Sequence, residues 1–140
     1  MKDIRPALRS YLLADSTVFG LVGGVRIYPV LMPQGQFSPS IVYNRITETT
    51  FYNMAGPAGM IQSIMQLDAW ARSQDGAVAL ADAVHDRLSG QRGTITWGAN
   101  SPLDEVVTRG VFSVNAREDY DAVAEMFRMS RDYQVWYLHG

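Results

Sequence analysis

Residues 127–137 carry a long alternation of side chains, and this alternation limits the possible fold more than any other part of the sequence. Every second position is mostly apolar or aromatic, and the positions between them are mostly polar. The first set is Phe127, Met129, Arg131, Tyr133, Val135 and Tyr137, and the second is Arg128, Ser130, Asp132, Gln134 and Trp136. A period of two is that of a β-strand, whose successive side chains point to opposite faces of a sheet. Because a strand of this length needs neighbours, the sequence predicts a β-sheet as the framework.

The rest of the chain predicts the elements that accompany this strand. Helices are expected at 3–14 and 73–88, a short helical turn at 17–22, and further strands at 26–30, 41–52, 61–72, 94–97 and 106–118, the last with a bulge at Gly110. We therefore expect one α+β domain over residues 1–140, with an antiparallel sheet of about four to six strands and two main helices packed on one of its faces.

Composition narrows the classes of function. The 140 residues have a net charge of −2, which argues against a nucleic-acid binder with a broad basic face. The absence of cysteine excludes disulfides and thiolate chemistry, and no apolar run approaches the ~20 residues that span a bilayer. We expect a protein made and used in the cytoplasm, or in an assembly built there.

Residues that could carry out catalysis or bind a metal are few and poorly arranged. His85 is expected on the exposed side of the second helix, and His139 adjoins the C-terminus, so neither forms part of a hydrolytic triad or a zinc site. Glu118, Asp119 and Asp121 are expected in one turn, but their spacing does not match a calcium loop. No catalytic residue, metal ligand or cofactor site is predicted.

Candidate contact residues lie in the segments that break the regular elements. The segments 31–40, 51–59 and 98–105 are rich in glycine, proline or asparagine and are expected to be loops. Apolar residues in such loops either tuck under the domain or contact a partner. The candidate interface residues are Met32, Phe37, Phe51, Tyr52, Met54 and Trp136. Trp136 lies on the more polar face of its strand, which predicts that a helix end or a neighbouring subunit covers that face.

Several segments, in this order, resemble a family of phage proteins. They read LRSYLLAD, VFGLVGGVRIYPV, PQG, PSIVYNRI, QLDAWARSQDGAVALADAV, SVNAREDYD and YQVWY, and together they extend over most of the chain. This pattern is similar to that of the tail-completion, or tail-terminator, proteins of long-tailed bacteriophages, formerly catalogued as a domain of unknown function. The segment from Gly98 to Val107 departs from the pattern, and nothing is transferred there.

The resemblance implies a structural protein without catalysis. Members of the family form a ring, usually a hexamer, that caps the completed tail tube at the head–tail junction of the virion and joins it to the neck or head-closure protein. DNA would pass through the lumen without sequence-specific binding, and no membrane is involved. Two alternatives stay open: another head–tail connector component, such as a head-closure or adaptor protein, and a small hydrolytic or ligand-binding domain.

Overall fold

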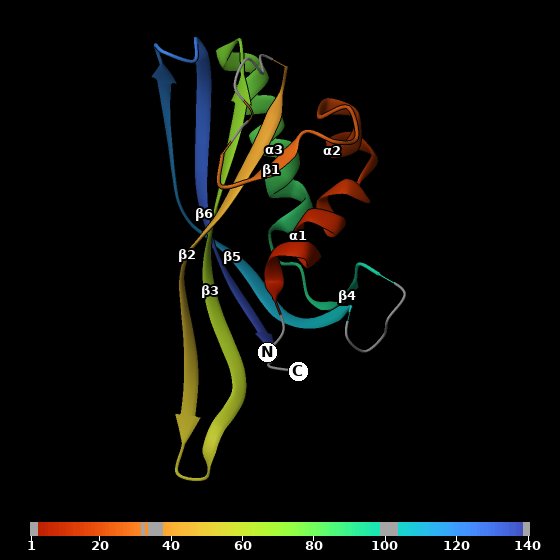
Figure 1. Cartoon of the computed structure of the whole chain (residues 1–140), viewed down its shortest axis with the longest axis vertical. Coiled ribbons are helices and arrows are strands. Elements are labelled where there is room, and N and C mark those ends of the chain that lie inside the picture. Colours follow the sequence, from red (N-terminus) through yellow and green to blue (C-terminus); the bar gives the residue numbers. More distant parts are fainter. Residues whose placement is uncertain (1–2, 32, 34–37, 99–103, 139–140) are drawn as a thin grey trace.

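The computed structural model describes residues 3–31, 33, 38–98 and 104–138 of the chain. Within these ranges the chain forms three helices and six strands (Figure 1), so the expected α+β class is confirmed. The helices are α1 (Ile4–Leu13), α2 (Ser16–Leu21) and α3 (Gln74–Leu88), and the strands are β1 (Ile27–Pro29), β2 (Ser40–Asn53), β3 (Gly56–Ala71), β4 (Gly93–Thr96), β5 (Glu105–Asp121) and β6 (Met126–Leu138).

The six strands form one curled sheet in the order β1-β2-β3-β6-β5-β4. The four long central strands are antiparallel to their neighbours, as expected. The expectation of a purely antiparallel sheet is wrong, because β1 pairs with β2 in parallel, with Ile27 opposite Ile41 and Pro29 opposite Tyr43. A parallel neighbour requires a crossover connection instead of a hairpin, and the short apolar run of β1 did not reveal its direction.

Local sequence explains where the helices begin and end. Asp3, Asp15 and Ser73 are N-caps whose side chains accept hydrogen bonds from backbone N–H groups in the first turns of α1, α2 and α3. Just beyond α2, Gly23 and Gly24 have φ of +60° and +79°, a conformation that glycine adopts without steric cost. The glycine-rich segment is therefore a helix stop, as the sequence predicted.

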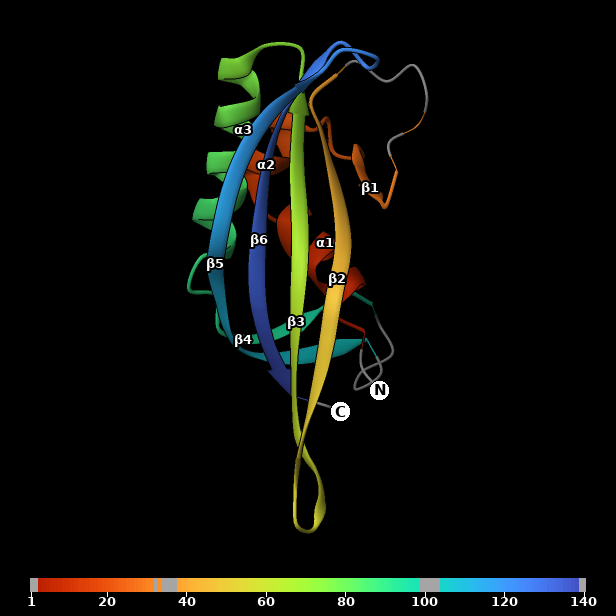
Figure 2. The same ribbon diagram turned by 90° about the vertical axis from the view of Figure 1, so that its left-hand side faces the viewer.

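The hydrophobic core lies between the helices and one face of the sheet. Alternate residues of β3 and β6 face this side, including Ile61, Met65, Tyr133, Val135 and Tyr137, and each of these is fully buried. They pack in one cluster with residues of α1 and α3, namely Ile4, Leu8, Leu12, Leu80, Val84 and Leu88. Figure 2 shows the helices behind the sheet, while no described element lies in front of it.

Two hairpins extend from opposite ends of the molecule (Figure 1). The β2–β3 hairpin turns at residues 54–55, and the β5–β6 hairpin turns at residues 122–125. The expected loop at 51–59 and the turn expected at 119–125 are thus too long, because the flanking strands continue into both segments. Glycine and acidic residues lowered the strand propensity of these stretches, but cross-strand pairing outweighs local preference there.

Candidate interface surfaces

The tip of the β2–β3 hairpin exposes two large side chains. Tyr52 is 71% exposed and Met54 is fully exposed, although both are of types that usually bury their surface. The turn is ordered locally, since the Asn53 side chain accepts a hydrogen bond of 2.9 Å from the backbone N–H of Ala55. Two of the candidate interface residues therefore lie together on a defined turn, far from the hydrophobic core.

The face of the sheet away from the helices is called the open face. An aromatic strip crosses this open face close to the β2–β3 hairpin. The rings of Phe51 and Trp136 stack with centroids 5.3 Å apart and planes 13° apart. Gly110 pairs with Trp136 on the other side, and the ring of Phe112 lies over Gly110, where an added Cβ would come within 2.7 Å of it. Phe112 is 53% exposed. Trp136 therefore packs against another side chain of the sheet, and its contact with a neighbouring subunit stays a prediction.

The other half of the open face is polar and internally paired. The hydroxyl of Ser130 donates to the carboxylate of Asp68, and the amide of Gln66 donates to both residues, at 3.1 Å and 3.0 Å. These bonds allow Asp68 and Ser130 to be buried although they lie on the face away from the helices.

Two ion pairs flank this polar cluster. Arg117 lies 3.3 Å from Asp132, and the Nε of Arg128 donates to Asp119 at 2.9 Å. The hydrogen bonds that Arg128 donates to Asp119 raise the pKa of the Arg128 guanidinium above its ordinary value. Pairs this exposed add little stability, so they mainly fix the side chains of a charged surface.

His85 is not the exposed helical residue that the sequence predicted. Its Nδ1 lies 3.1 Å from the hydroxyl of Tyr133, a side chain that is fully buried beneath α3. Burial raises the pKa of the Tyr133 hydroxyl, and the neighbouring Arg131 partly offsets this. The prediction missed this pairing because helical periodicity alone does not show that the buried residue opposite His85 carries a hydroxyl. The histidine therefore satisfies a buried polar group.

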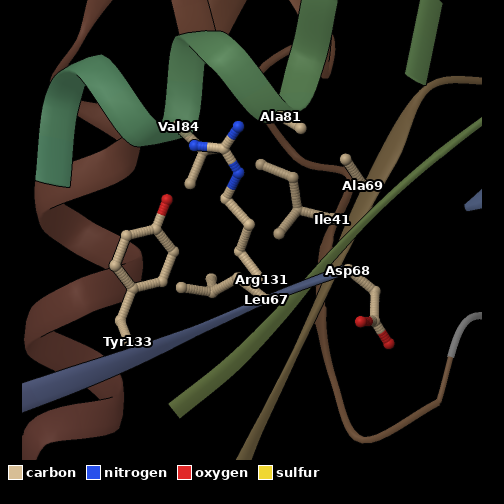
Figure 3. Close-up of a pocket in the computed structure, with 8 residues that line it drawn as sticks. All are labelled: Ile41, Leu67, Asp68, Ala69, Ala81, Val84, Arg131 and Tyr133. Carbon is tan, nitrogen blue, oxygen red and sulfur yellow. The ribbon is translucent and has the colours of Figure 1, made fainter. Parts of the chain in front are cut away.

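The space under α3 is too small for a ligand. Figure 3 shows Arg131 and Tyr133 extending from β6 toward Val84 and Ala81 of the helix. The cavity that these residues line has a volume of about 10 Å³, room for one water at most. Arg131 reaches out to Asp82 at 3.5 Å, and its Nε has no hydrogen-bond partner among the described residues. This arrangement fits a packed interior better than a binding site.

The other residues considered for metal binding, catalysis or contact are either hydrogen-bonded within the subunit or lie outside the described residues. The three carboxylates sit at the end of β5 instead of in one turn: Glu118 accepts from Gln74, Asp119 from Arg128, and Asp121 from the backbone of Val123 and Ala124. Among residues 3–31, 33, 38–98 and 104–138, no three His, Asp or Glu side chains are grouped to hold a metal ion. Met32, Phe37 and His139 lie outside the described residues. No described helix has the length and apolar character needed to cross a membrane.

Comparison with known proteins agrees with a protein that works through contacts with other proteins. The family model described as "Tail completion protein gp17" matches residues 6–138. Among solved structures, a chain from the "Virion of native gene transfer agent (GTA) particle" superposes with a TM-score of 0.70 at 18% identity, covering 97% of this chain and 95% of that one. At this identity the likeness shows a shared fold. No curated protein matches the chain.

The fold and the family model define a structural protein of the phage tail, located in the virion. The chain belongs to the tail completion protein gp17 family, and the resemblance seen in the sequence is confirmed.

Proposed function

We propose that the protein forms a closed homo-oligomeric ring, a hexamer, which caps the completed tail tube and joins it to the neck or head-closure protein. The family match over residues 6–138 carries this proposal. The ring ends polymerisation of the tube and offers a new surface to the head. In this function the protein makes and breaks no covalent bond.

The projecting hairpins suit contacts above and below such a ring. Met54 and Tyr52 lie at the tip of one hairpin, and Val123, which is 97% exposed, lies at the turn of the other. The two tips are at opposite ends of the molecule (Figure 1), so one ring can contact two different partners at once. Methionine and tyrosine adapt well to a partner surface. We assign the Met54 tip to the tail-tube protein and the Val123 tip to the neck protein.

The charge of the subunit is compatible with DNA passing through the lumen. A strongly basic lumen would retain DNA through release of counterions, whereas this chain has a net charge of −2. On the face of the sheet away from the helices, Arg117 and Arg128 are also paired with carboxylates. DNA would therefore move past the ring without sequence-specific contacts.

Deletion of the gene for this protein, in a strain whose particles contain it, tests the proposal directly. Without the cap, tubes should grow to variable lengths and fail to join filled heads, which electron microscopy of negatively stained lysates measures. Native mass spectrometry of the purified protein should show a species of about six times the 15.6-kDa subunit mass. Tails of uniform length attached to heads in the deletion strain would overturn the proposal. Binding of the purified protein to heads but not to isolated tubes would favour a head-closure role instead.

A further inference from the structure

Both outer long strands of the sheet have edges that the short end strands cover only in part. β1 pairs with β2 at Ile41–Tyr43 only. β4 pairs with β5 at residues 105–108, and the N–H of Gly90 adds one bond to the carbonyl of Val111. Beyond these points, no described backbone group pairs with the outer edges of residues 44–53 of β2 and 112–121 of β5.

The two free edges overlap at one level of the sheet, where residues 44–47 of β2 lie level with residues 112–115 of β5. One row of paired residues crosses the four long strands through Arg45, Met65, Tyr133 and Ser113. Each outer strand has a bulge beside this row, with Ile46 as the extra residue of β2 and Val114 as the extra residue of β5. Ile46 is 49% exposed and Val114 is 55% exposed, so each edge presents an aliphatic β-branched residue at the same height.

The sequence of these edges favours strand pairing. Residues 112–116 read Phe-Ser-Val-Asn-Ala and contain neither a charge nor a proline, the two features that usually protect an edge strand. Residues 44–48 read Asn-Arg-Ile-Thr-Glu and contain two charges, Arg45 and Glu48. Both charges are engaged within the subunit, because Arg45 lies 3.5 Å from Glu48, and Glu48 accepts a hydrogen bond of 2.7 Å from the hydroxyl of Tyr137.

The strand directions match as well. Because β2, β3, β6 and β5 alternate in direction, β2 and β5 run antiparallel to one another. When two copies are related by rotation about an axis along the strands, β2 of one copy meets β5 of the next in antiparallel orientation. Such a contact joins two different surfaces, which is what a cyclic ring requires. Closing the ring then covers the free edges at this level in every subunit.

We propose that β2 of one subunit pairs through residues 44–47 with residues 112–115 of β5 in the next subunit, so that the sheets join into one continuous wall around the ring. This inference rests on the proposed ring function and identifies the contact that builds it. The partner at this surface is a second copy of the chain. Ile46 and Val114 lie at the centre of the expected contact.

Disulfide trapping tests the contact, because the natural chain contains no cysteine. Ile46→Cys and Val114→Cys are placed together in one chain. Within a subunit the two positions are separated by three inter-strand spacings, about 14 Å, and a disulfide needs Cα atoms within about 7 Å. Every disulfide must therefore join two subunits. Oxidation should give a ladder of linked species on a non-reducing gel. The largest species should contain all the subunits of one ring. Strand tilt shifts the register, so Ile46→Cys is also paired with Phe112→Cys and with Ala116→Cys.

Single variants show whether the contact joins two different edges. Oxidised Ile46→Cys alone and Val114→Cys alone should remain unlinked, and an equal mixture of the two should give linked dimers that contain one of each. Self-linking of either single variant would overturn the proposal, since it indicates pairing of like edges. The pair Met54→Cys with Val123→Cys, at the two hairpin tips, is the matched control that should not form the ladder.

The same experiment separates this inference from the proposed function. Rings of normal mass in which none of the three cysteine pairs becomes linked would overturn the strand pairing and leave the ring standing. Absence of linked species both in solution and in particles that incorporate the variants would also overturn the pairing. Linking to a different virion protein in place of a second copy would do the same. Absence of the protein from particles would overturn the proposed function itself.

Discussion

The ring of Phe51 stacks on the indole of Trp136 although a whole strand separates β2 from β6. Trp136 pairs with Gln62 of β3, and Gln62 pairs with Thr49 of β2, so the two rings meet across the backbone of β3. The bulge between Thr50 and Tyr52 places Phe51 at this point. The stack therefore ties the base of the projecting hairpin to the body of the sheet.

Replacement of Phe51 should loosen this attachment. We expect Phe51→Ala to lower the free energy of unfolding by at least about 1 kcal/mol, because a stacked aromatic pair contributes roughly that much in addition to the burial of its surface. Urea titration measures this loss, and the tryptophan emission of the chain, to which Trp136 contributes beside Trp70 and Trp97, should move to longer wavelength as the Trp136 ring becomes more exposed to water. Tyr52→Ala, at the next residue, removes a side chain that is 71% exposed and should change neither quantity. Equal effects of the two variants would show that the stack does not stabilise the hairpin.

A charge at the hairpin tip should affect docking and not folding. Met54 is fully exposed, so Met54→Asp should leave the thermal midpoint within about 1 °C of wild type, as surface substitutions usually do. Its binding to isolated tail tubes, measured by co-sedimentation, should fall at least tenfold, because docking would bury an unpaired carboxylate. Val123→Asp at the opposite tip should retain tube binding. If Met54→Asp binds tubes as well as wild type does, the tip is not the joint.

Loss of His85 should affect stability and not function. His85→Ala leaves the buried hydroxyl of Tyr133 without its partner at 3.1 Å, so the free energy of unfolding should fall by about 1–2 kcal/mol. Tyr133→Phe in the same chain removes the unpaired hydroxyl and should recover part of this loss. Particle yield at low temperature should remain normal for His85→Ala. A large loss of infectious particles with folded protein present would indicate a chemical role for the imidazole.

The stability of the fold should decline at high pH because of Tyr137. Burial raises the pKa of Tyr137 to about 12 from the ordinary value of 10.0, while its hydrogen bonds to Ser63 and Glu48 act in opposite directions. Below pH 10 the phenol is protonated in both the folded and the unfolded chain, so its contribution to stability is fully present there. Between about pH 10 and 12 only the unfolded chain releases the proton, and the free energy of unfolding decreases.

Chemical denaturation at several pH values measures this decline. Tyr137→Phe should be less stable than wild type at pH 8, because Glu48 and Ser63 lose a partner, but its stability should fall less steeply above pH 10. Tyr120→Phe, at an exposed tyrosine near the other end of the sheet, is the control and should keep the wild-type slope. An unchanged slope in Tyr137→Phe would contradict this assignment.

Much of the fold follows from local patterns, and the errors share one cause. The alternation at 127–137 predicts β6, which runs from Met126 to Leu138, and the bulge expected at Gly110 is present as a register shift between Thr108 and Gly110. The direction of β1 and the full lengths of the hairpins were missed. These depend on pairing with distant strands, and pairing overrides the weak local preferences of glycine and acidic residues.

The surfaces were less predictable than the fold. Tyr52 and Met54 are exposed at a turn, as expected of contact residues, and their role remains a prediction. The covering of Trp136 by Phe51 was not foreseen, because it requires a bulge that brings β2 across β3. The environment of His85 depends on which side chain of β6 lies beneath α3, and helical spacing does not contain this information.

β3 extends without interruption from the hairpin turn to the residues that precede α3. Its 16 residues span about 50 Å as one strand, with pairing on both sides for most of that length. The regular pairing is broken at one place, because the register shifts between Thr50 and Tyr52 opposite Gly59, whose φ is +82°. A force applied at Met54 would therefore bend the hairpin at this point, while the doubly paired part of β3 from Ile61 to Trp70 moves with the body of the subunit.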